Sequence, residues 1–160
     1  MHELVLIVAK YVVVVPVLAW VVVLVLLPKT SRVRFVLFSA ACVGVTLLLV
    51  KLATTIHSDP RPFMRDGVHP YFKSSTDNGF PSDHTVFSAL LAFVIMHYRR
   101  NVGLGLLAVA VAIGGARVIS GVHHGQDIVA GVVIAGLATY SVVGAHYLYC
   151  RIVKRAASQQ

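Results

Sequence analysis

The sequence has few acidic residues, few charged residues of any kind and little cysteine. Six Asp and Glu stand against 14 Lys and Arg, which gives a formal net charge of +8 over 160 residues. Charged residues make up 12% of the chain and hydrophobic residues 58%, whereas a soluble domain is about 25% charged. This composition excludes a soluble enzyme and a disordered tail. The two cysteines, Cys42 and Cys150, lie in apolar runs, so neither a disulfide framework nor a Cys-x-x-Cys metal site is indicated.

Long apolar runs are what the sequence has in abundance. A helix needs about 20 apolar residues to cross the hydrocarbon core of a bilayer, and five segments reach or approach that length: residues 4–27, 35–56, 82–98, 102–119 and 128–149. The first is too long for a signal-peptide core and has no small-residue cleavage site after it, so we expect a retained helix, kinked at Pro16. The sequence predicts an all-α, polytopic membrane helix bundle of about five transmembrane helices.

The connections between these segments differ in charge. Alternate connections and the C-terminal segment carry eight basic residues and no acid: Lys29, Arg32, Arg34, Arg99, Arg100, Arg151, Lys154 and Arg155. The opposite side carries all six acids: Glu3, Asp59, Asp66, Asp77, Asp83 and Asp127. The positive-inside rule predicts a cytoplasmic C-terminus and an outer N-terminus in the cytoplasmic membrane. Because much of the basic charge is a topology signal, nucleic acid is not an expected partner.

Ionisable side chains within or beside membrane spans are candidates for function. On the predicted outer side they cluster at the ends of four segments and in the long polar connection of residues 57–81. The candidates are Lys51, Arg61, Arg65, Ser82, Asp83, His84, Arg117, His123, His124 and Asp127. Helix ends that are distant in sequence are therefore expected to converge on one pocket.

These residue types suit phosphate chemistry. Arg61 and Arg117 offer planar guanidinium groups that match phosphate oxygens. A helix starting near Ser82 would direct its free first-turn amides at an anion. His123 and Asp127 are four residues apart, so one face of a helix start can hold both. A carboxylate bonded to one imidazole nitrogen fixes the tautomer and leaves the other nitrogen free to attack.

Three motifs carry a family resemblance: Arg61-Pro62, Pro81-Ser82-Asp83-His84 and Arg117-x5-His123-x3-Asp127. They resemble the three-part signature of the type 2 phosphatidic acid phosphatase superfamily, whose membrane members dephosphorylate lipids. The resemblance implies that His123 is the nucleophile that forms a phosphohistidine, that Asp127 orients it and that His84 is the general acid. It also implies that Arg61, Arg117 and the Ser82–Asp83 region bind phosphate, without a metal or a cofactor.

The chain departs from the family pattern at three positions. Thr54 stands at the position of the first-motif Lys, and the nearest lysine is Lys51, one helical turn deeper. Lys51 either reaches the phosphate with its long stem or the contact is absent. Asp83 replaces a Gly, and Ala116 replaces a Ser. The Pro-Ser-Asp-His-Thr form is similar to the bacterial undecaprenyl-diphosphate phosphatases, and the family usually has six spans rather than five.

The expected function is therefore metal-independent dephosphorylation of a membrane lipid at the outer face of the cytoplasmic membrane. The resemblance favours undecaprenyl diphosphate, converted to undecaprenyl phosphate and phosphate. Phosphatidylglycerophosphate and phosphatidic acid remain alternative substrates. A zinc site at His84, His123, His124 and Asp127 and a non-enzymatic phospholipid-binding protein are the competing hypotheses. We expect residues 1–160 to form one membrane-embedded domain, with the motifs in residues 51–127.

Overall fold

The computed structural model describes residues 2–158, which form helices and no strand. The all-α prediction is confirmed for these residues. In chain order the helices are α1 (His2–Tyr11), α2 (Val14–Leu26), α3 (Lys29–Ile56), α4 (Pro62–Arg65), α5 (Asp83–Tyr98), α6 (Arg100–Ile119) and α7 (Gly125–Ala157).

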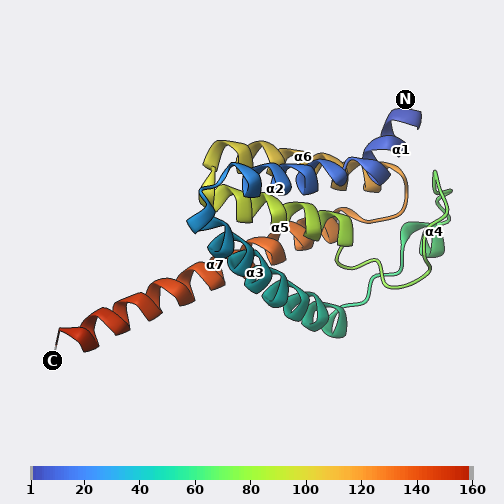
Figure 1. The fold of residues 1–160 in the computed structure, drawn as a ribbon. Helices are drawn as coiled ribbons and strands as arrows, with labels where there is room; N and C mark the ends of the chain where they lie inside the picture. The colour runs from blue at the N-terminus through green and yellow to red at the C-terminus, as the bar shows by residue number, and fades with distance from the viewer. Residues whose placement is uncertain (1, 159–160) are drawn as a thin grey trace.

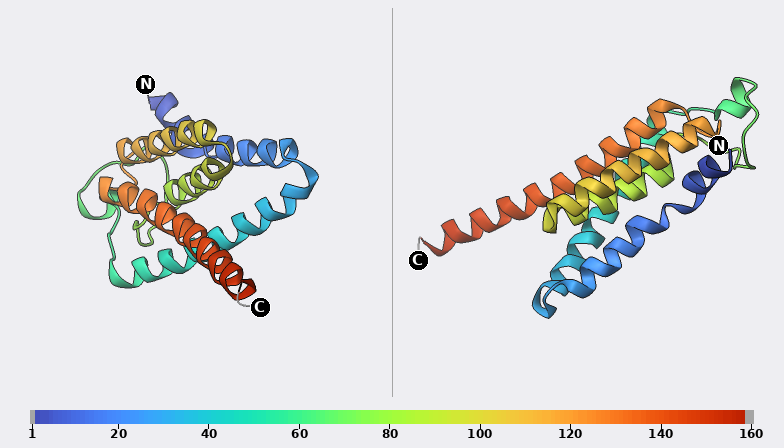
Figure 2. Two further views of the ribbon diagram at one scale, coloured as in Figure 1. Left: turned by 90° about the vertical axis from the view of Figure 1, so that its left-hand side faces the viewer. Right: turned by 90° about the horizontal axis from the view of Figure 1, so that it is seen from above.

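The long helices run back and forth between two ends of a bundle (Figures 1 and 2). One end holds the start of α1, the short helix α4 and the starts of α5 and α7. Helix α5 lies in the middle, because it packs against α2, α3, α6 and α7. Its buried side chains are mostly small or aliphatic, including Ala89, Ala92, Val94 and Ile95, which lets the neighbouring helices approach closely. Helix α5 therefore positions its own first turn and the connection that leads into it from α4.

Three helices, α3, α6 and α7, are long and apolar enough to cross a membrane, and the bent pair α1 and α2 counts as a fourth. The third predicted span corresponds to α5, which has 16 residues. At about 1.5 Å per residue it is about 24 Å long, which is shorter than a hydrocarbon core of about 30 Å. The structure thus supports three to four spans by length, against the five that the sequence predicts.

The first apolar segment is broken rather than continuous. Helix α1 ends at Tyr11, α2 begins at Val14, and their axes differ by 43°. The cause is Pro16, since a proline ring excludes the carbonyl of the residue four positions earlier, here Val12, and donates no amide hydrogen bond to it. The predicted kink therefore lies one turn before the proline. As a result, α1 tilts over the end of the bundle that α4 also covers.

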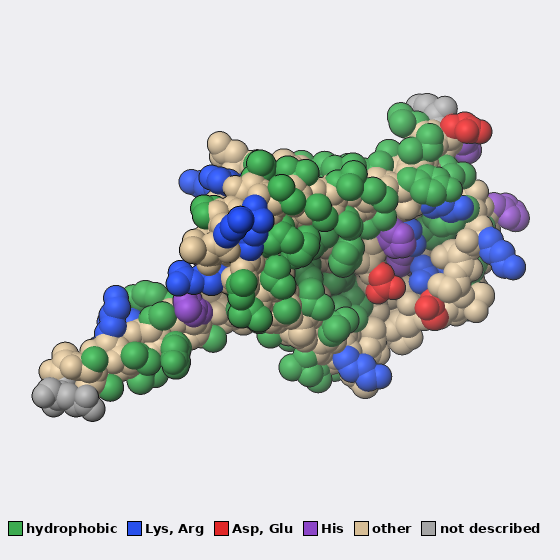
Figure 3. All heavy atoms as spheres, in the orientation of Figure 1, with side chains coloured by type: hydrophobic (Ala, Val, Ile, Leu, Met, Phe, Trp, Pro, Cys, Tyr) green, Lys and Arg blue, Asp and Glu red, His purple; other side chains and the backbone are tan. Residues whose placement is uncertain are grey.

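Charge and apolar surface are separated along the molecule. Hydrophobic side chains cover the flank of the bundle, while the visible Asp and Glu side chains and several His side chains lie at the end that carries α4 (Figure 3). The exposed hydrophobic residues include Leu37, Leu48 and Val129. Helix α7 has 33 residues and extends beyond the bundle at the opposite end, where its last turns carry Arg151, Lys154 and Arg155. A bundle with a hydrophobic flank and two polar ends is suited to a bilayer, whose core offers no water to polar groups.

Close helix contacts depend on glycine at two positions. A Cβ atom built on Gly103 would overlap the backbone of Met96 at the α5–α6 corner. One built on Gly114 would overlap Cγ2 of Ile128 in α7 and lie 3.1 Å from Oγ1 of Thr85 in α5. By contrast, Gly115 has nothing within 4 Å of such an atom. Gly114 therefore sets the distance between the three helices that start or end near the polar connection.

We expect Gly114→Ala to lower the stability of the bundle by about 1–3 kcal/mol, because overpacking forces neighbouring side chains or backbone to shift. The matched control is Gly115→Ala, one position along the same helix, which should leave stability nearly unchanged. Thermal unfolding of the detergent-purified protein, followed by circular dichroism, measures both. Equal melting temperatures for the two variants would contradict the assigned contact between Gly114 and Ile128.

Candidate active site

A cavity of about 320 Å³ opens at the end of the bundle that carries α4. Its walls come from α1, from the connections on either side of α4, from the start of α5 and the end of α6, and from the α6–α7 connection. The lining residues are Lys10, Arg61, Phe72, Lys73, Ser74, Ser75, Asp83, His84, Arg117 and His123. Segments distant in sequence thus converge on one polar pocket, as the sequence predicts.

His123 lies at the buried base of this cavity, with 3% of its surface exposed. Its Nδ1 atom is 3.2 Å from Oδ2 of Asp127, and its Nε2 atom is 3.2 Å from Nη1 of Arg61. A guanidinium can only donate, so Nε2 must be the acceptor, and Nδ1 must carry the proton that it donates to Asp127. The two neighbours therefore fix one neutral tautomer, in which the lone pair of Nε2 points toward Arg61, another residue of the cavity wall.

The turn that brings His123 and Asp127 together is a helix cap. Helix α7 begins at Gly125 with His124 as its N-cap, and Oδ2 of Asp127 accepts the backbone N–H of His124 at 2.8 Å. His123 therefore precedes the helix rather than lying on its first turn, which corrects the predicted placement of both residues on one helix face. The contact exists because the capping carboxylate reaches back over the chain that enters the helix.

Arg61 is held beside His123 by the α6–α7 connection and by the loop before α5. It is 5% exposed. Its Nη1 donates to the carbonyl of Val122 at 3.2 Å, and its Nη2 donates to Oγ of Ser75 at 3.2 Å and to Oδ1 of Asp77 at 2.9 Å. Its Nε is buried and has no hydrogen-bond partner among the described residues. One N–H donor of this guanidinium is therefore left for an anion.

Arg117 lies in the last turn of α6 and is 6% exposed. Its Nη1 donates to the carbonyl of Ala9 at 3.1 Å, which ties α6 to α1. The carbonyls in the last turn of a helix lack amide partners further along, and the break after Tyr11 makes this acceptor available. The Nε of Arg117, like that of Arg61, is buried without a partner in the described part of the chain.

The start of α5 forms another wall. Ser82 is the N-cap residue of α5 and is fully buried. Its backbone N–H donates to the carbonyl of Asp127 at 3.2 Å, and its hydroxyl accepts a hydrogen bond from the hydroxyl of Thr85 at 3.2 Å. The predicted helix start is confirmed, although the hydroxyl of Ser82 does not cap the helix. Asp83 and His84, in the first turn, line the cavity directly. A histidine and a carboxylate thus face the same space as Arg61 and Arg117.

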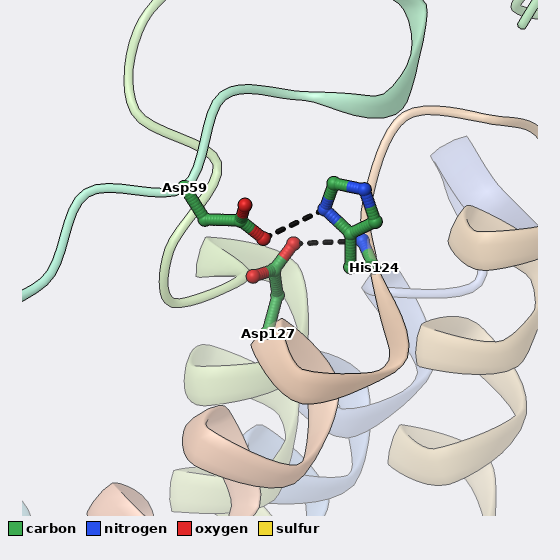
Figure 4. A group of neighbouring side chains, drawn as sticks. All are labelled: Asp59, His124 and Asp127. Carbon is green, nitrogen blue, oxygen red and sulfur yellow. Dashed lines mark hydrogen bonds and ion pairs between the residues drawn. The ribbon is translucent and has the colours of Figure 1, made fainter. Parts of the chain in front are cut away.

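A second polar cluster lies behind His123 and consists of Asp59, Asp66, Arg65, His124 and Gln126. Nδ1 of His124 is 2.6 Å from Oδ2 of Asp59, and its Nε2 is 3.0 Å from Oδ2 of Asp66 (Figure 4 shows the Asp59 side). Asp59 also accepts from Gln126 at 2.6 Å and from Arg65 at 3.2 Å. The cluster joins the loop that follows α3 to the start of α7.

The carboxylates of this cluster also bear on metal binding. Ligand atoms of Asp59, His124 and Asp127 lie within 4.8 Å of one another, which is close enough for one ion. This set shares His124 and Asp127 with the predicted zinc site but leaves out His84 and His123. The Arg65 guanidinium at Asp59 already supplies a positive charge there. The geometry therefore favours an ion-pair network over a cation site.

The pKa values of the adjacent residues His123 and His124 are shifted in opposite directions. Burial lowers the pKa of His123, and the charges of Arg117 and Arg61 act in the same direction, while the hydrogen bond to Asp127 opposes them. For His124, burial also favours the neutral form, but the hydrogen bonds and charges of Asp66 and Asp59 prevail and raise its pKa. At neutral pH His123 is therefore a neutral base, whereas His124 retains its proton more readily.

Most of the predicted residues are brought together. Arg61, Asp83, His84, Arg117 and His123 line the cavity, and Ser82 and Asp127 lie directly behind its wall. Lys51 is exposed on α3 and does not line the cavity, so the structure does not bring it to the other predicted phosphate ligands.

The sequence interpretation missed residues of α1 and of the loop before α5. Lys10, Phe72, Ser74 and Ser75 line the cavity, and Asp77 pairs with Arg61. A signal for Lys10 was present, since it is the single charged residue between positions 4 and 27 and an ionisable residue in a span is a functional candidate. The loop residues carry no comparable signal.

Comparisons with known proteins identify the family of the chain. A family model described as the PAP2 superfamily matches residues 33–149. The chain is 31% identical over 118 residues to the bacitracin transport permease protein BcrC of Bacillus licheniformis, covering 72% of this chain and 58% of that protein. It is 29% identical over 108 residues to undecaprenyl-diphosphatase BcrC of Bacillus subtilis (strain 168), covering 67% and 55%. The chain thus spans less than two thirds of the length of these relatives.

A solved structure shows that the fold is also shared. The crystal structure of Aquifex aeolicus LpxE superposes with a TM-score of 0.66, over 89% of this chain and 82% of that one. The sequence identity is 22%, so the likeness extends to the fold and no further.

The ion pairs of His124 should make stability depend on pH. Because the folded state raises its pKa, the stabilisation is fully present below the unfolded value of about 6.5 and is lost as pH rises through the folded value. We expect His124→Gln to lower stability by up to about 1 kcal/mol at pH 6 and by less at pH 9. Melting temperatures of both proteins across this range test it. A gap that is constant with pH would mean that the ring contributes through packing alone.

Proposed function

The chain belongs to the PAP2 superfamily, and from this premise we propose that it is a membrane lipid phosphatase that converts undecaprenyl diphosphate to undecaprenyl phosphate and phosphate. The observation that carries the proposal is the base of the cavity. There the neutral Nε2 of His123 faces the same space as two buried arginines, each with an N–H donor that no described residue accepts. The name of the Bacillus subtilis relative supports the choice of lipid.

In the proposed first step, Nε2 of His123 attacks the terminal phosphorus of the diphosphate. The bond between that phosphorus and the bridging oxygen breaks, and His84 gives a proton to the leaving oxygen of the lipid monophosphate. Arg61 and Arg117 bind the non-bridging oxygens, where charge must be stabilised during phosphoryl transfer. Asp127 holds the proton on Nδ1 and stabilises the positive charge that develops on the ring.

In the second step, water attacks the phosphorus of the phosphohistidine. The P–N bond breaks, its electron pair returns to Nε2, and His84 takes a proton from the water. Phosphate leaves with the oxygen of that water, and both histidines regain their starting state. Proton donation by His84 in one step and acceptance in the next is the usual requirement for a two-step displacement.

The proposed reaction uses no metal and no cofactor. Arg61 and Arg117 supply the positive charge that a divalent cation supplies in other phosphatases. Their guanidinium groups line the same cavity as His84 and His123, and they would repel an ion bound by those histidines. This argument favours the phosphatase over the zinc site that the sequence left open.

We propose that the chain crosses the membrane five times, with its N-terminus and the cavity on the outer side of the cytoplasmic membrane. Helix α5 would be the third crossing in chain order; although it is short, it packs against α2, α3, α6 and α7 in the middle of the bundle. The eight basic residues of the opposite end would then be cytoplasmic, as the positive-inside rule requires. Residues 1–160 would act as one membrane-embedded unit.

The first test is phosphate release by detergent-purified protein from undecaprenyl diphosphate, phosphatidylglycerophosphate and phosphatidic acid, with a chelator present. We expect His123→Ala to reduce release at least about 10³-fold, because the nucleophile is lost. His69→Ala is the control, since His69 is an exposed loop histidine outside the cavity. Turnover near the wild-type rate in His123→Ala would refute the assignment. A folded wild-type protein that releases no phosphate from any lipid would favour the lipid-binding alternative.

The pH dependence gives a separate test. His123 must be neutral to attack, and because burial lowers its pKa, the acid limb of kcat/KM should lie below the ordinary value of about 6.5. Asp127→Asn removes a hydrogen bond and a charge that raise this pKa. The acid limb of that variant should therefore move to still lower pH while kcat falls. An acid limb that does not move would assign it to the substrate phosphate instead.

A further inference from the structure

Two lysines of the cavity have no part in the reaction described above. Lys10 of α1 and Lys73 of the loop before α5 line the cavity together with Phe72. The Nζ of Lys10 lies 4.5 Å from the centre of the Phe72 ring, and the Arg117 guanidinium lies 5.9 Å from the same ring. No ion pair in residues 2–158 involves either lysine. We refer to Lys10, Phe72 and Lys73 as the cationic rim.

The position of Lys10 is determined by the break in the first apolar segment. Helix α1 tilts by 43° against α2, and the hydrogen bond from Arg117 to the carbonyl of Ala9 fixes its last turn against α6. Lys10 is the next residue, so the same arginine that faces the base of the cavity also holds the lysine at its wall. In a continuous helix the carbonyl of Ala9 would accept an amide of the following turn instead.

The loop half of the rim is anchored at both of its ends. The N–H of Tyr71 donates to the carbonyl of Ser120 at 3.1 Å, and the ring of Tyr71 lies 4.4 Å from that of His2 in α1. At the other end, Ser75 and Asp77 accept hydrogen bonds from Arg61. These contacts hold Phe72 and Lys73 between α1 and the base of the cavity.

Depth separates the rim from the base. Arg61, Arg117 and His123 are 5%, 6% and 3% exposed, whereas Lys10 is half-buried and Lys73 is exposed. A terminal phosphate at His123 would occupy the buried base, and whatever it is attached to would extend toward the rim. For a monophosphate lipid that group is an uncharged alkyl oxygen, whereas for a diphosphate lipid it is a second phosphate.

We propose that the cationic rim is a second phosphate subsite, which binds the phosphate that stays on the lipid and so selects diphosphates over monophosphates. The inference rests on the proposed phosphatase function. The distribution of charge supports it: Lys10, Arg61, Lys73 and Arg117 line the cavity, with Asp83 as the only carboxylate among the described lining residues. Asp77 already pairs with Arg61 at the base, whereas no described carboxylate pairs with Lys10 or Lys73, so the unpaired positive charge at the rim suits a second phosphate. Lys51, which is exposed outside the cavity, cannot contribute from its observed position.

The test compares kcat and KM for a diphosphate and a monophosphate carried on the same polyprenyl chain. We expect Lys10→Gln and Lys73→Gln each to lower kcat/KM for the diphosphate by about tenfold, as loss of a charged hydrogen bond typically does, mainly through KM. Monophosphate turnover should change by less than about twofold. Lys10→Arg keeps the charge and should restore most of the diphosphate activity. Lys29→Gln, at the opposite end of the bundle, is the matched control.

A second readout does not require turnover. Diphosphate and phosphate anions are titrated against the wild type, Lys10→Gln and Lys73→Gln, and the rise in melting temperature reports binding. Preference of the wild type for the diphosphate anion should shrink in Lys10→Gln.

The outcomes are distinct. Equal losses on both lipids would place Lys10 on the transferred phosphate and overturn the subsite. Unchanged selectivity, or a loss of diphosphate activity in Lys51→Gln instead of Lys10→Gln, would also overturn it. A wild type that hydrolyses neither lipid would refute the phosphatase, while its anion preference would still decide whether the rim binds a second phosphate.

Discussion

The site depends on one buried carboxylate. Oδ2 of Asp127 accepts the Nδ1–H of His123 and the backbone N–H of His124, and the main-chain carbonyl of Asp127 accepts the N–H of Ser82 at the start of α5. One residue thus caps α7, orients the imidazole and joins the two helices whose N-termini meet at the cavity. Burial of a carboxylate is costly unless it is hydrogen-bonded, so this arrangement is tightly constrained. Any shift of α7 would move the helix cap and the candidate nucleophile together.

The same constraint explains why the cavity is so cationic. The two arginines lie where α4, α6 and the α6–α7 connection meet, and the carbonyls of Val122 and Ala9 and the carboxylate of Asp77 accept three of their N–H donors. The Nε donors of Arg61 and Arg117 are buried and have no partner among the described residues. A buried donor without an acceptor destabilises the folded protein by about 1–3 kcal/mol, and an anion in the cavity would remove that penalty. Stability is thus lower at the site than the rest of the bundle would allow.

Local sequence was sufficient to predict part of this arrangement and not the rest. The spacing of His123 and Asp127 predicts their contact, because a helix N-terminus brings residues three to four positions apart together whatever surrounds them. The convergence of Arg61, Arg117 and His84 follows from the alternation of apolar segments, which places these residues at the same end of the bundle. The partners of Arg61 in the loop could not be predicted, since Ser75 and Asp77 have no periodic pattern. The sequence left the role of Lys51 open for a related reason: the sequence of a helix indicates how far along it a residue lies but not the direction in which its side chain points.

The hydrogen bond between Arg117 and Ala9 joins residues that are 108 positions apart in the sequence. During synthesis the N-terminal helices enter the membrane first, and closure of so long a loop has an entropic cost that only later contacts offset. The wall formed by α1 can therefore close only after α6 has been inserted, and His123 is made later still. While α1 to α5 are being made, α1 therefore has no partner for the carbonyl of Ala9. The cavity is completed only once the α6–α7 connection has been made, and a chain that stops before it would lack the candidate nucleophile, His123.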